Sequence, residues 1–375
     1  MKRFDNLFDK LISDQNLSTA IDKVNRTHHW LNNHRPNGIT AWVELTKRDR
    51  IADLRKIIND GFVPKPAKVT ERWDSSAGKM RTISEPVQWP DQYVHHALIQ
   101  VLEPAFMRGM DPYCSGSIPG RGIHYAKKSI EKWVNTDIKG TKYEFCGDIR
   151  HFYDTISPEV VMDRMRSIIK DRKVLELIHT IVKDGIKIGA YTSQWFANTI
   201  LQPLDQLIRQ SGMCRYYVRY VDNLTIFGPN KRKLRKLHVI IEKWLHDHKL
   251  QLKSDWQIFP TSKRLPDAVG YRYGVGYTLP RKKNLLKLKR AISKFLKNKN
   301  ITAKTASGML SMIGQLKHCG NVNLYKMLFG GRKIVKQLKT IVRNNHRKEL
   351  ITWSTFLAQM ANSRSFERRA IAIQN

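Results

Sequence analysis

The chain has 375 residues, 41% of them hydrophobic. That length allows two or three domain-sized units, and that hydrophobic content excludes a disordered chain. Charge is the outlier, because 67 Lys and Arg stand against 32 Asp and Glu and leave a net charge of +35. Such an excess favours a polyanionic partner, above all a phosphate backbone, over an anionic membrane surface.

Cysteine content and hydropathy exclude two further classes. The cysteines lie far apart and form no C-x-x-C pair, so a zinc knuckle is excluded and reduced thiols of a cytosolic protein are expected. They are Cys114, Cys146, Cys214 and Cys319. The first residues contain no apolar signal-peptide core, and no uncharged apolar run reaches the roughly 18 residues of a membrane span. No membrane partner is therefore expected.

The first 140 residues predict helices around one strand pair. Residues 1–62 predict a helical N-terminal extension, whose last helix, in DRIADLRKIINDG, ends at Gly61. WDSSAGKMRTI predicts two strands joined near Gly78. YVHHALIQVLEPAF predicts a buried helix that ends at Pro104, and SGSIPGRGIHYAKKSIEKW predicts a loop that leads into a further helix.

Strands and helices alternate between residues 143 and 275. The order predicted is a strand, two helices, a hairpin, a helix and two strands, carried by YEFCGDI, PEVVMDRMRSIIK, TSQWFANTILQPLDQLI, YYVRYVDNLTIFG, KLRKLHVIIEKWLHDH, WQIFP and AVGYRYG. A hairpin among helices indicates an α+β layer with an antiparallel sheet. The chain contains neither G-x-G-x-x-G nor a Walker motif, which argues against a Rossmann or P-loop fold.

The last quarter of the chain is helical and strongly basic. From residue 281 onward 22 Lys and Arg face only two Glu, a net +20. Leu285, Leu288, Ile292 and Phe295 recur at helical spacing with basic residues between them. A charge run is usually a solvated face, but this imbalance favours contact with nucleic acid.

Asp222 and Asn223 separate two apolar runs in RYVDNLTIF, which predicts a hairpin with this pair at its tip. An ordinary turn has the same pattern, so a chemical role depends on a second carboxylate nearby. Asp148 is the candidate, because it follows a short apolar strand in FCGDIRHFYDTIS. Two such carboxylates can hold two divalent ions that activate a 3′-hydroxyl and stabilise the leaving pyrophosphate. Mg²⁺ suits oxygen ligands.

Several segments resemble the motifs of reverse transcriptases and follow one another along the chain in the order of that family. GDIRHFYDTI, GIKIGAYTSQWFAN and RYYVRYVDN are similar to the first palm motif, the second palm motif and the Tyr-x-Asp-Asp hairpin. VGYRYG resembles the strand that grips the primer end. Upstream, KMRTISEP and PGRGIHYA resemble the fingers segment that contacts the triphosphate and the template-facing loop. The resemblance covers about residues 65–330.

The resemblance implies a right-hand polymerase fold. Its expected parts are an N-terminal helical extension at 1–62, fingers at 63–140, a palm with an antiparallel sheet at 141–280 and a basic helical thumb at 281–375. It implies RNA-directed DNA polymerase activity, with an RNA template, a DNA primer and product, and dNTPs as partners. A dedicated non-coding RNA, an accessory protein or a second copy of the chain would complete the assembly in the bacterial cytoplasm.

Site roles follow from the same resemblance. It implies that the metal ligands are Asp148, Asp222 and the backbone carbonyl of Ile149. Tyr153 would exclude ribonucleotides, while Lys253 would protonate pyrophosphate. Lys79 and Arg81 would bind the triphosphate. The pocket around the nascent base pair would be shaped by Gly189, Ser193 and Gln194.

Two positions depart from the family pattern. The second hairpin Asp is Asn223 here, which removes one negative charge, so we expect weaker metal binding and a shift from Mg²⁺ toward Mn²⁺. Ile188 stands where many retroviral-type enzymes have Gln. Its context resembles bacterial enzymes of the diversity-generating and antiphage-defence groups.

Three functions remain in view. The expected one is a reverse transcriptase that copies an associated RNA in antiphage defence. The alternatives are an error-prone enzyme of a diversity-generating retroelement and a catalytically weak RNA-binding scaffold on a polymerase fold. A basic structural protein of the ribosomal kind accounts for the charge but not for the ordered motifs.

Overall fold

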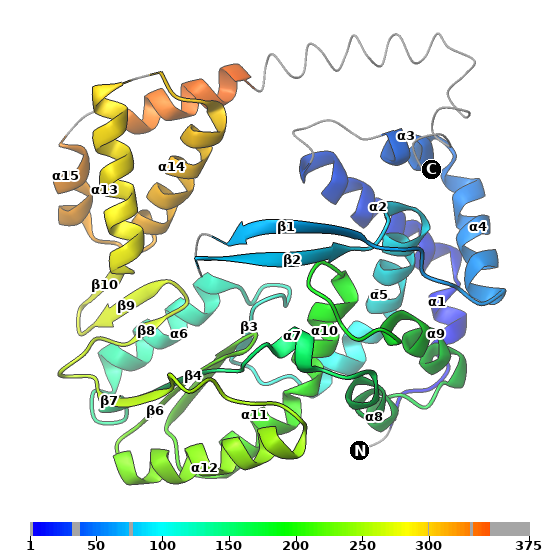
Figure 1. Cartoon of the computed structure of the whole chain (residues 1–375), viewed down its shortest axis with the longest axis horizontal. Coiled ribbons are helices and arrows are strands. Elements are labelled where there is room, and N and C mark those ends of the chain that lie inside the picture. Colours follow the sequence, from blue (N-terminus) through cyan, green and yellow to red (C-terminus); the bar gives the residue numbers. More distant parts are fainter. Residues whose placement is uncertain (1–2, 32–37, 75–77, 299, 331–332, 346–375) are drawn as a thin grey trace.

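The structure is a computed structural model that describes residues 3–31, 38–74, 78–298, 300–330 and 333–345. Its palm is a five-stranded sheet of order β3-β5-β6-β4-β7. The strands are β3 (Cys114–Ser115), β4 (Tyr143–Asp148), β5 (Tyr216–Tyr220), β6 (Asn223–Gly228) and β7 (Gln257–Pro260). All neighbours pair antiparallel except the two-residue β3, which runs parallel to β5. The predicted α+β class with an antiparallel sheet is thus confirmed (Figure 1).

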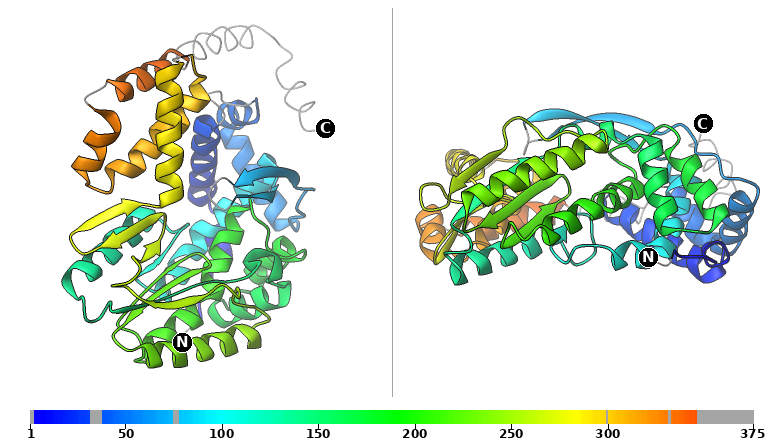
Figure 2. Two further views of the ribbon diagram at one scale, coloured as in Figure 1. Left: turned by 60° about the vertical axis from the view of Figure 1, so that its left-hand side comes forward. Right: turned by 90° about the horizontal axis from the view of Figure 1, so that it is seen from below.

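Two palm helices, α11 and α12, lie on the side of the sheet that is turned away from the thumb, and the other palm helices lie beside the sheet (Figure 1). The palm helices are α7 (Phe152–Thr155), α8 (Pro158–Ile168), α9 (Arg172–Val182), α10 (Tyr191–Ile200), α11 (Gln202–Gln210) and α12 (Lys231–Asp247) (Figures 1 and 2). α12 follows β6 and buries one apolar stripe that includes Leu234, Leu237 and Ile241. That stripe fixes α12 to the sheet and leaves its opposite face in solvent.

The N-terminal helices share the core of the palm. They are α1 (Phe8–Leu11), α2 (Asp14–Leu31), α3 (Gly38–Leu45) and α4 (Lys47–Asn59). Their buried residues, from Leu7 onward, belong to one apolar cluster that also contains α5 (Tyr93–Arg108) and most palm helices. The extension therefore packs as an integral layer of the molecule. The thumb has a separate apolar cluster, which includes Leu288 and Leu338.

The fingers hairpin and the thumb stand on opposite sides of the space above the sheet (Figure 1). The hairpin consists of β1 (Lys68–Asp74) and β2 (Lys79–Glu85), and a π-helical turn, Gln88–Gln92, connects it to α5. A small sheet of β8 (Asp267–Ala268), β9 (Tyr271–Gly274) and β10 (Tyr277–Pro280) leads into the thumb, beside α6 (Ile123–Thr136). The thumb helices are α13 (Lys282–Lys297), α14 (Ala303–Lys317), α15 (Val322–Phe329) and helical residues 334–345. Residues 346–375 of the predicted thumb lie outside the described residues.

Three local predictions were wrong. Pro104 does not end its helix, because α5 continues to Arg108 and buries Leu102, Ala105 and Phe106 around the proline, so packing outweighs the lost hydrogen bond. The helix predicted in TSQWFANTILQPLDQLI is two helices, α10 and α11, which meet at Leu201 before a proline in the first turn of α11. The third concerns the tip of the β5–β6 hairpin.

Tyr220 pairs with Asn223, so the turn consists of Val221 and Asp222, and Asn223 is the first residue of β6. Val221 has φ +56°, a conformation that a β-branched residue rarely adopts. The predicted tip was therefore displaced by one residue. None of the described helices has the length and apolar character needed to cross a membrane.

Candidate active site

Asp148 and Asp222 lie side by side at one end of the palm sheet. β4 ends at Asp148, which pairs with Asn223 at the start of β6, and the Ile149 N–H donates to the Asp222 carbonyl at 3.1 Å. Burial raises the pKa of Asp222, and the negative charge of Asp148 raises this pKa further. Two carboxylates so close repel each other unless a cation lies between or beside them.

Lys253 supplies one such cation. Its Nζ lies 2.6 Å from Asp148 Oδ1, and its backbone N–H donates to the Asp148 carbonyl at 2.8 Å. Apart from this ammonium, the buried Asp148 Oδ1 has no polar partner among the described residues. The ammonium thus partly neutralises one carboxylate, and the role of Lys253 as proton donor to pyrophosphate stays a prediction.

The oxygen donors of this site fit a hard divalent cation. Asp148, Asp222 and the amide oxygen of Asn223 are the ligand types that Mg²⁺ prefers, and Asp148 Oδ1 has no polar partner besides the Lys253 ammonium among the described residues. Asn223 Nδ2 donates to Asp222 Oδ1 at 3.1 Å, which fixes the amide beside the carboxylate. Among the described residues no group of three or more His, Cys, Asp or Glu is arranged to hold a metal.

Tyr153 and Arg81 reach the same site from α7 and β2. Burial, together with the smaller effect of the Asp222 charge, raises the pKa of Tyr153 to about 12, and Arg81 opposes this rise. Arg81 also lowers the pKa of Asp222. Its Nε lies 2.6 Å from Asp74 Oδ2 on β1, so the guanidinium is held near the turn end of the fingers hairpin. Lys79 is exposed at the start of β2.

The second palm motif forms the wall behind this site. Ile188 accepts a hydrogen bond from the Ser84 N–H of β2 at 2.7 Å. Gly189 has φ +122°, and a Cβ at this position would lie 2.6 Å from the Ser84 carbonyl oxygen, so only glycine permits the contact. The buried Ser193 hydroxyl accepts from the Lys187 N–H at 3.2 Å and braces the loop, while Gln194 is half-buried.

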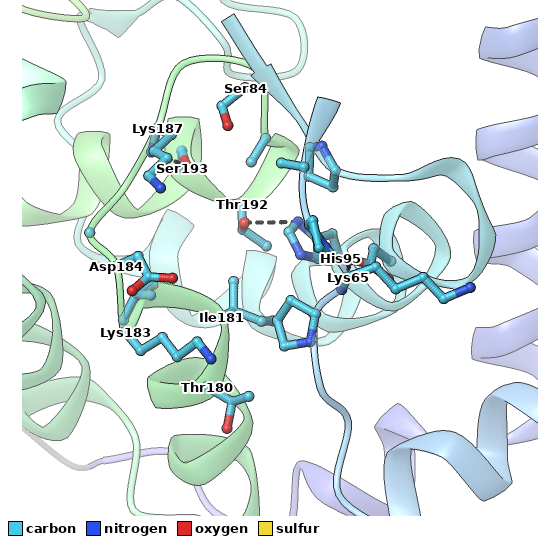
Figure 3. A pocket seen from close by; sticks show the side chains of 18 residues that line it. Lys65, Ser84, His95, Thr180, Ile181, Lys183, Asp184, Lys187, Thr192 and Ser193 are labelled. Carbon is cyan, nitrogen blue, oxygen red and sulfur yellow. Dashed lines mark hydrogen bonds between the residues drawn. The ribbon is translucent and has the colours of Figure 1, made fainter. Parts of the chain in front are cut away.

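Two concavities flank this wall. A groove of about 620 Å³ extends from Asp148 and Asn223 toward the thumb, where Arg281 and Lys283 line it. We call this groove the cleft. A second pocket, of about 380 Å³, lies behind the wall and is lined by Ser193, His95 and Asp91, but by neither Asp148 nor Asp222 (Figure 3). His95 Nδ1 and Thr192 Oγ1 are 3.1 Å apart there.

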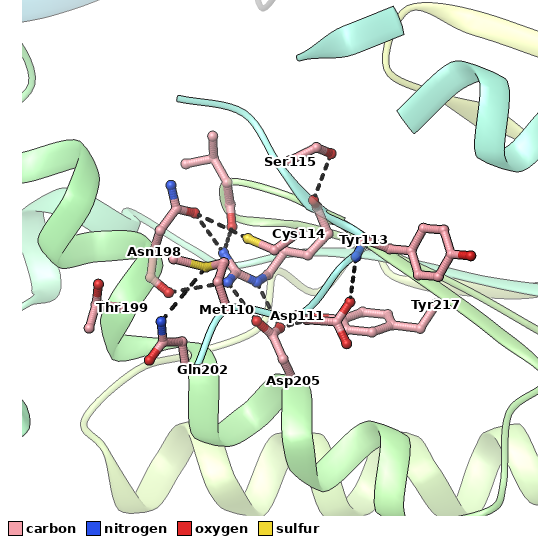
Figure 4. Close-up of polar contacts among 12 residues, drawn as sticks. Met110, Asp111, Tyr113, Cys114, Ser115, Asn198, Thr199, Gln202, Asp205 and Tyr217 are labelled. Atoms are coloured by element: carbon pink, nitrogen blue, oxygen red, sulfur yellow. Dashed lines mark hydrogen bonds and ion pairs between the residues drawn. The ribbon is translucent and has the colours of Figure 1, made fainter. Parts of the chain in front are cut away.

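A buried polar network below the hairpin was not predicted (Figure 4). Arg219, which is fully buried, makes a bidentate ion pair with Asp205 of α11 at 2.7 and 2.8 Å. It also donates to the Asn198 side chain and to the Val221 carbonyl, each at 2.9 Å. The signal in the sequence is a lone arginine inside the apolar strand YYVRY, which requires a buried partner. The identity of that partner cannot be read from sequence spacing.

The comparisons with known proteins identify the family. Residues 63–258 match the family described as reverse transcriptase (RNA-dependent DNA polymerase). This is more than half of the chain, which therefore belongs to the reverse transcriptase family, a class of nucleotidyltransferases. Family membership and the palm topology together define a right-hand polymerase fold.

Three curated relatives match parts of the chain. Nuclear intron maturase 1, mitochondrial, of Arabidopsis thaliana is 33% identical over 29% of this chain and 15% of its own length. The group II intron-encoded protein LtrA of Lactococcus lactis subsp. cremoris is 24% identical over 44% of this chain and 29% of its own. Protein YkfC of Escherichia coli (strain K12) is 22% identical over 41% and 44%. The chain thus spans less than half the length of each of these relatives.

Two solved telomerase structures are also similar. Telomerase from Candida albicans, solved with a fragment of telomeric RNA, has a TM-score of 0.49 at 13% identity, over 80% of this chain and 59% of that chain. Apo telomerase from Candida tropicalis has a TM-score of 0.42 at 14% identity, over 64% and 58%.

Proposed function

We propose that this protein is an RNA-directed DNA polymerase that adds deoxynucleotides to a primer end on an RNA template. The observation that carries the proposal is the juxtaposition of Asp222 with Asp148, which lines the cleft, with Tyr153 and Arg81 beside them. Strands far apart in sequence converge to place these side chains. Membership in the reverse transcriptase family supports the same chemistry.

Each side chain has a definite task in this proposal. Asp148, Asp222 and the Ile149 carbonyl would hold two divalent ions, Mg²⁺ or Mn²⁺, which supply activation of the 3′-hydroxyl and charge stabilisation at the leaving group. Arg81 and Lys79 bind the triphosphate from the fingers side. The Gly189 loop, with Ser193 and Gln194 at the start of α10, supports the nascent base pair from behind.

Lys253 acts as the proton donor to pyrophosphate. Its ammonium already lies 2.6 Å from Asp148 Oδ1, next to a carboxylate that would hold the metal ions. Tyr153 places its ring where a ribose 2′-hydroxyl would lie and thereby selects dNTPs by steric exclusion.

We infer that the template is a dedicated non-coding RNA copied in bacterial antiphage defence, in the cytoplasm, with an accessory protein or a second copy of the chain as a partner. Bacterial relatives such as LtrA and YkfC support a bacterial origin. Ile188 also supports the alternative of an error-prone enzyme in a diversity-generating retroelement. A near-repeat of a variable gene segment beside this gene would favour that alternative, and an isolated operon in a defence locus would favour the first.

Asn223 motivates a second candidate, a catalytically weak RNA-binding scaffold, because its amide engages the carboxylate of Asp222. Primer extension on an RNA template with dNTPs, in Mg²⁺ and in Mn²⁺, separates the two. We expect extension by the wild type, none by Asp222→Asn, and acceptance of rNTPs by Tyr153→Ala but not by Tyr153→Phe. Tight RNA binding without extension in either metal would establish the scaffold.

A further inference from the structure

Four segments meet at the end of the palm sheet opposite to Asp148. Tyr143, at the start of β4, pairs with Gly228 on one side and with Pro260 on the other. The Thr261 N–H donates to the Lys142 carbonyl at 3.0 Å. The Arg215 Nε lies 3.4 Å from Asp137 Oδ2. Residues 137–142, 213–216, 228–236 and 260–264 therefore form one continuous surface.

This surface, which we call the distal patch, is strongly basic. Its Lys and Arg side chains are exposed except for the half-buried Lys231. They are Lys139, Lys142, Arg215, Lys231, Arg232, Lys233, Arg235, Lys236, Lys263 and Arg264. Asp137 is the one acidic residue in these four segments, and it is engaged by Arg215 and by the Tyr216 hydroxyl.

The cations of the distal patch have almost no carboxylate partners. In the N-terminal extension, by comparison, Lys47, Arg50 and Arg55 each form an ion pair with an aspartate, whereas exposed lysines such as Lys10 and Lys56 form none among the described residues. Among the residues that the structure describes, no member of the distal patch other than Arg215 has a carboxylate partner. An ordinary solvated face carries acidic residues interspersed among its cations. The distal patch has only Asp137, so it departs from that pattern.

Helix electrostatics point the same way. α12 begins at Lys231, and the Asn230 side chain accepts from the backbone N–H groups of Arg232 and Lys233 at 2.8 and 3.2 Å. The first turn contains three cations and no acid, at the end of the helix where the macrodipole is positive. These three cations therefore lower the stability of the free protein. An anion bound at the first turn of α12 would offset this loss of stability.

The distal patch is separate from the cleft. β4 is six residues long, so about 16–17 Å of strand lie between Tyr143 and Asp148. α12 covers the face of the sheet away from the thumb (Figure 2). The exposed apolar residues within reach, Ile138 and Val239, are isolated, whereas a membrane-binding helix needs a continuous apolar face. Phosphate groups of a nucleic acid fit this surface better than a lipid surface does.

We propose that the distal patch is a second RNA-binding surface, which holds a folded, double-stranded part of the RNA whose template end lies in the cleft. The inference rests on the proposed function, because that function makes RNA the resident polyanion. A-form RNA is recognised mainly through its backbone and shape, which an array of Lys and Arg supplies without base contacts. The distal patch would thus tether the RNA, while the cleft copies it.

The test compares two charge-matched double variants. Lys233→Glu with Lys263→Glu alters the distal patch, and Lys10→Glu with Lys56→Glu makes the same charge change on exposed, unpaired lysines of the N-terminal helices. The probes are a short RNA–DNA template–primer and the same hybrid whose RNA continues, at either end, through a flexible linker into a hairpin of about 20 base pairs. Thermal melting checks that both variants fold.

We expect the wild type and the control variant to bind the hairpin probe about 10-fold more tightly than the short hybrid. The distal variant should lose that advantage, and the salt dependence of its hairpin affinity should fall by about 2 in slope. Its affinity for the short hybrid should be unchanged. A retained advantage, an equal loss in both variants, or binding of wild type to phosphatidylserine vesicles in place of the hairpin would overturn the proposal.

The outcome is distinguishable from failure of the proposed function. If the wild type extends no primer but the hairpin advantage depends on the distal patch, the polymerase assignment fails and the RNA surface stands. If extension on the short hybrid is normal in all three proteins while the hairpin advantage is absent, the RNA surface fails and the polymerase assignment stands.

Discussion

The guanidinium of Arg219 donates a hydrogen bond to the backbone carbonyl of Val221 at 2.9 Å, directly before Asp222. Val221 has φ +56°, and such strain persists only where surrounding contacts fix it. The ion pair with Asp205 in turn fixes Arg219. A buried charge pair thus determines where the hairpin places the candidate catalytic carboxylate.

Arg219→Met alone should destabilise the protein by about 3–5 kcal/mol, because it leaves Asp205 buried without its partner. Arg219→Met combined with Asp205→Leu removes both charges and should recover much of that loss in urea unfolding. Primer extension by the double variant should nevertheless remain about 10-fold or more below the wild-type kcat, because misplaced reacting groups are costly. A stable double variant with wild-type kcat would show that the network serves stability alone.

Asn223→Asp should restore the missing charge of the metal site. The substitution removes the hydrogen bond from Nδ2 to Asp222 Oδ1 and adds a third carboxylate beside Asp148. We expect the Mg²⁺ concentration for half-maximal extension to fall about 5-fold, because ligand charge increases cation affinity. The preference for Mn²⁺ should shrink accordingly. Asn223→Ala, which supplies no oxygen, should raise the Mg²⁺ requirement, and an unchanged Mg²⁺ dependence in both variants would exclude position 223 from the metal site.

Gly189→Ala should separate the palm loop from the fingers strand. The new Cβ would meet the Ser84 carbonyl, and a positive φ of +122° is strained for any other residue. We expect a loss of about 1–3 kcal/mol in the free energy of unfolding together with weaker dNTP binding. Gly308→Ala is the matched control, because Gly308 lies in α14 with open space around its Cβ position. This substitution should stabilise the protein by about 0.5–1 kcal/mol. Equal effects at both glycines would contradict the contact.

The motifs of the palm could be predicted because each consists of consecutive residues that form one strand end or one turn. The hairpin tip was displaced by one residue because Val221, a poor turn residue, is fixed by tertiary bonds to Arg219 and Ser115 and not by local preference. Pairing of Arg219 with Asp205 depends on how α11 packs beneath β5, which no local pattern encodes. The distal patch likewise arises only when four separate segments meet.

The triphosphate side of the site was predicted less completely. The sequence indicates Arg81 as a ligand, but its contact with Asp74 across the β1–β2 ladder depends on a strand register that becomes known only in the structure. The position of Lys253 also becomes known only in the structure, because an isolated β-bridge between Ile149 and Leu252 places it beside Asp148. Single residues that join distant elements are therefore the part of this site that sequence motifs leave open.

Asp91 gives the protein a pH-dependent stability that is independent of the active site. It is buried, its Oδ2 accepts from the Lys65 N–H at 2.9 Å, and its Oδ1 has no hydrogen-bond partner. Burial raises the pKa of Asp91 from 3.8 to about 6. The folded state therefore holds this proton more tightly than the unfolded chain does. The resulting stabilisation is complete below about pH 4 and is lost as the pH rises through about 6.

Asp91→Asn should mimic the protonated acid and keep an acceptor for the Lys65 N–H. We expect the variant to be more stable than the wild type by about 2–3 kcal/mol at pH 7.5, since each pKa unit corresponds to about 1.4 kcal/mol. At pH 4 the two proteins should unfold at the same urea concentration. Asp91→Ala, which removes the acceptor as well, should be less stable than Asp91→Asn at both pH values. A stability difference between Asp91→Asn and the wild type that does not change with pH would show that Asp91 keeps an ordinary pKa in the folded protein.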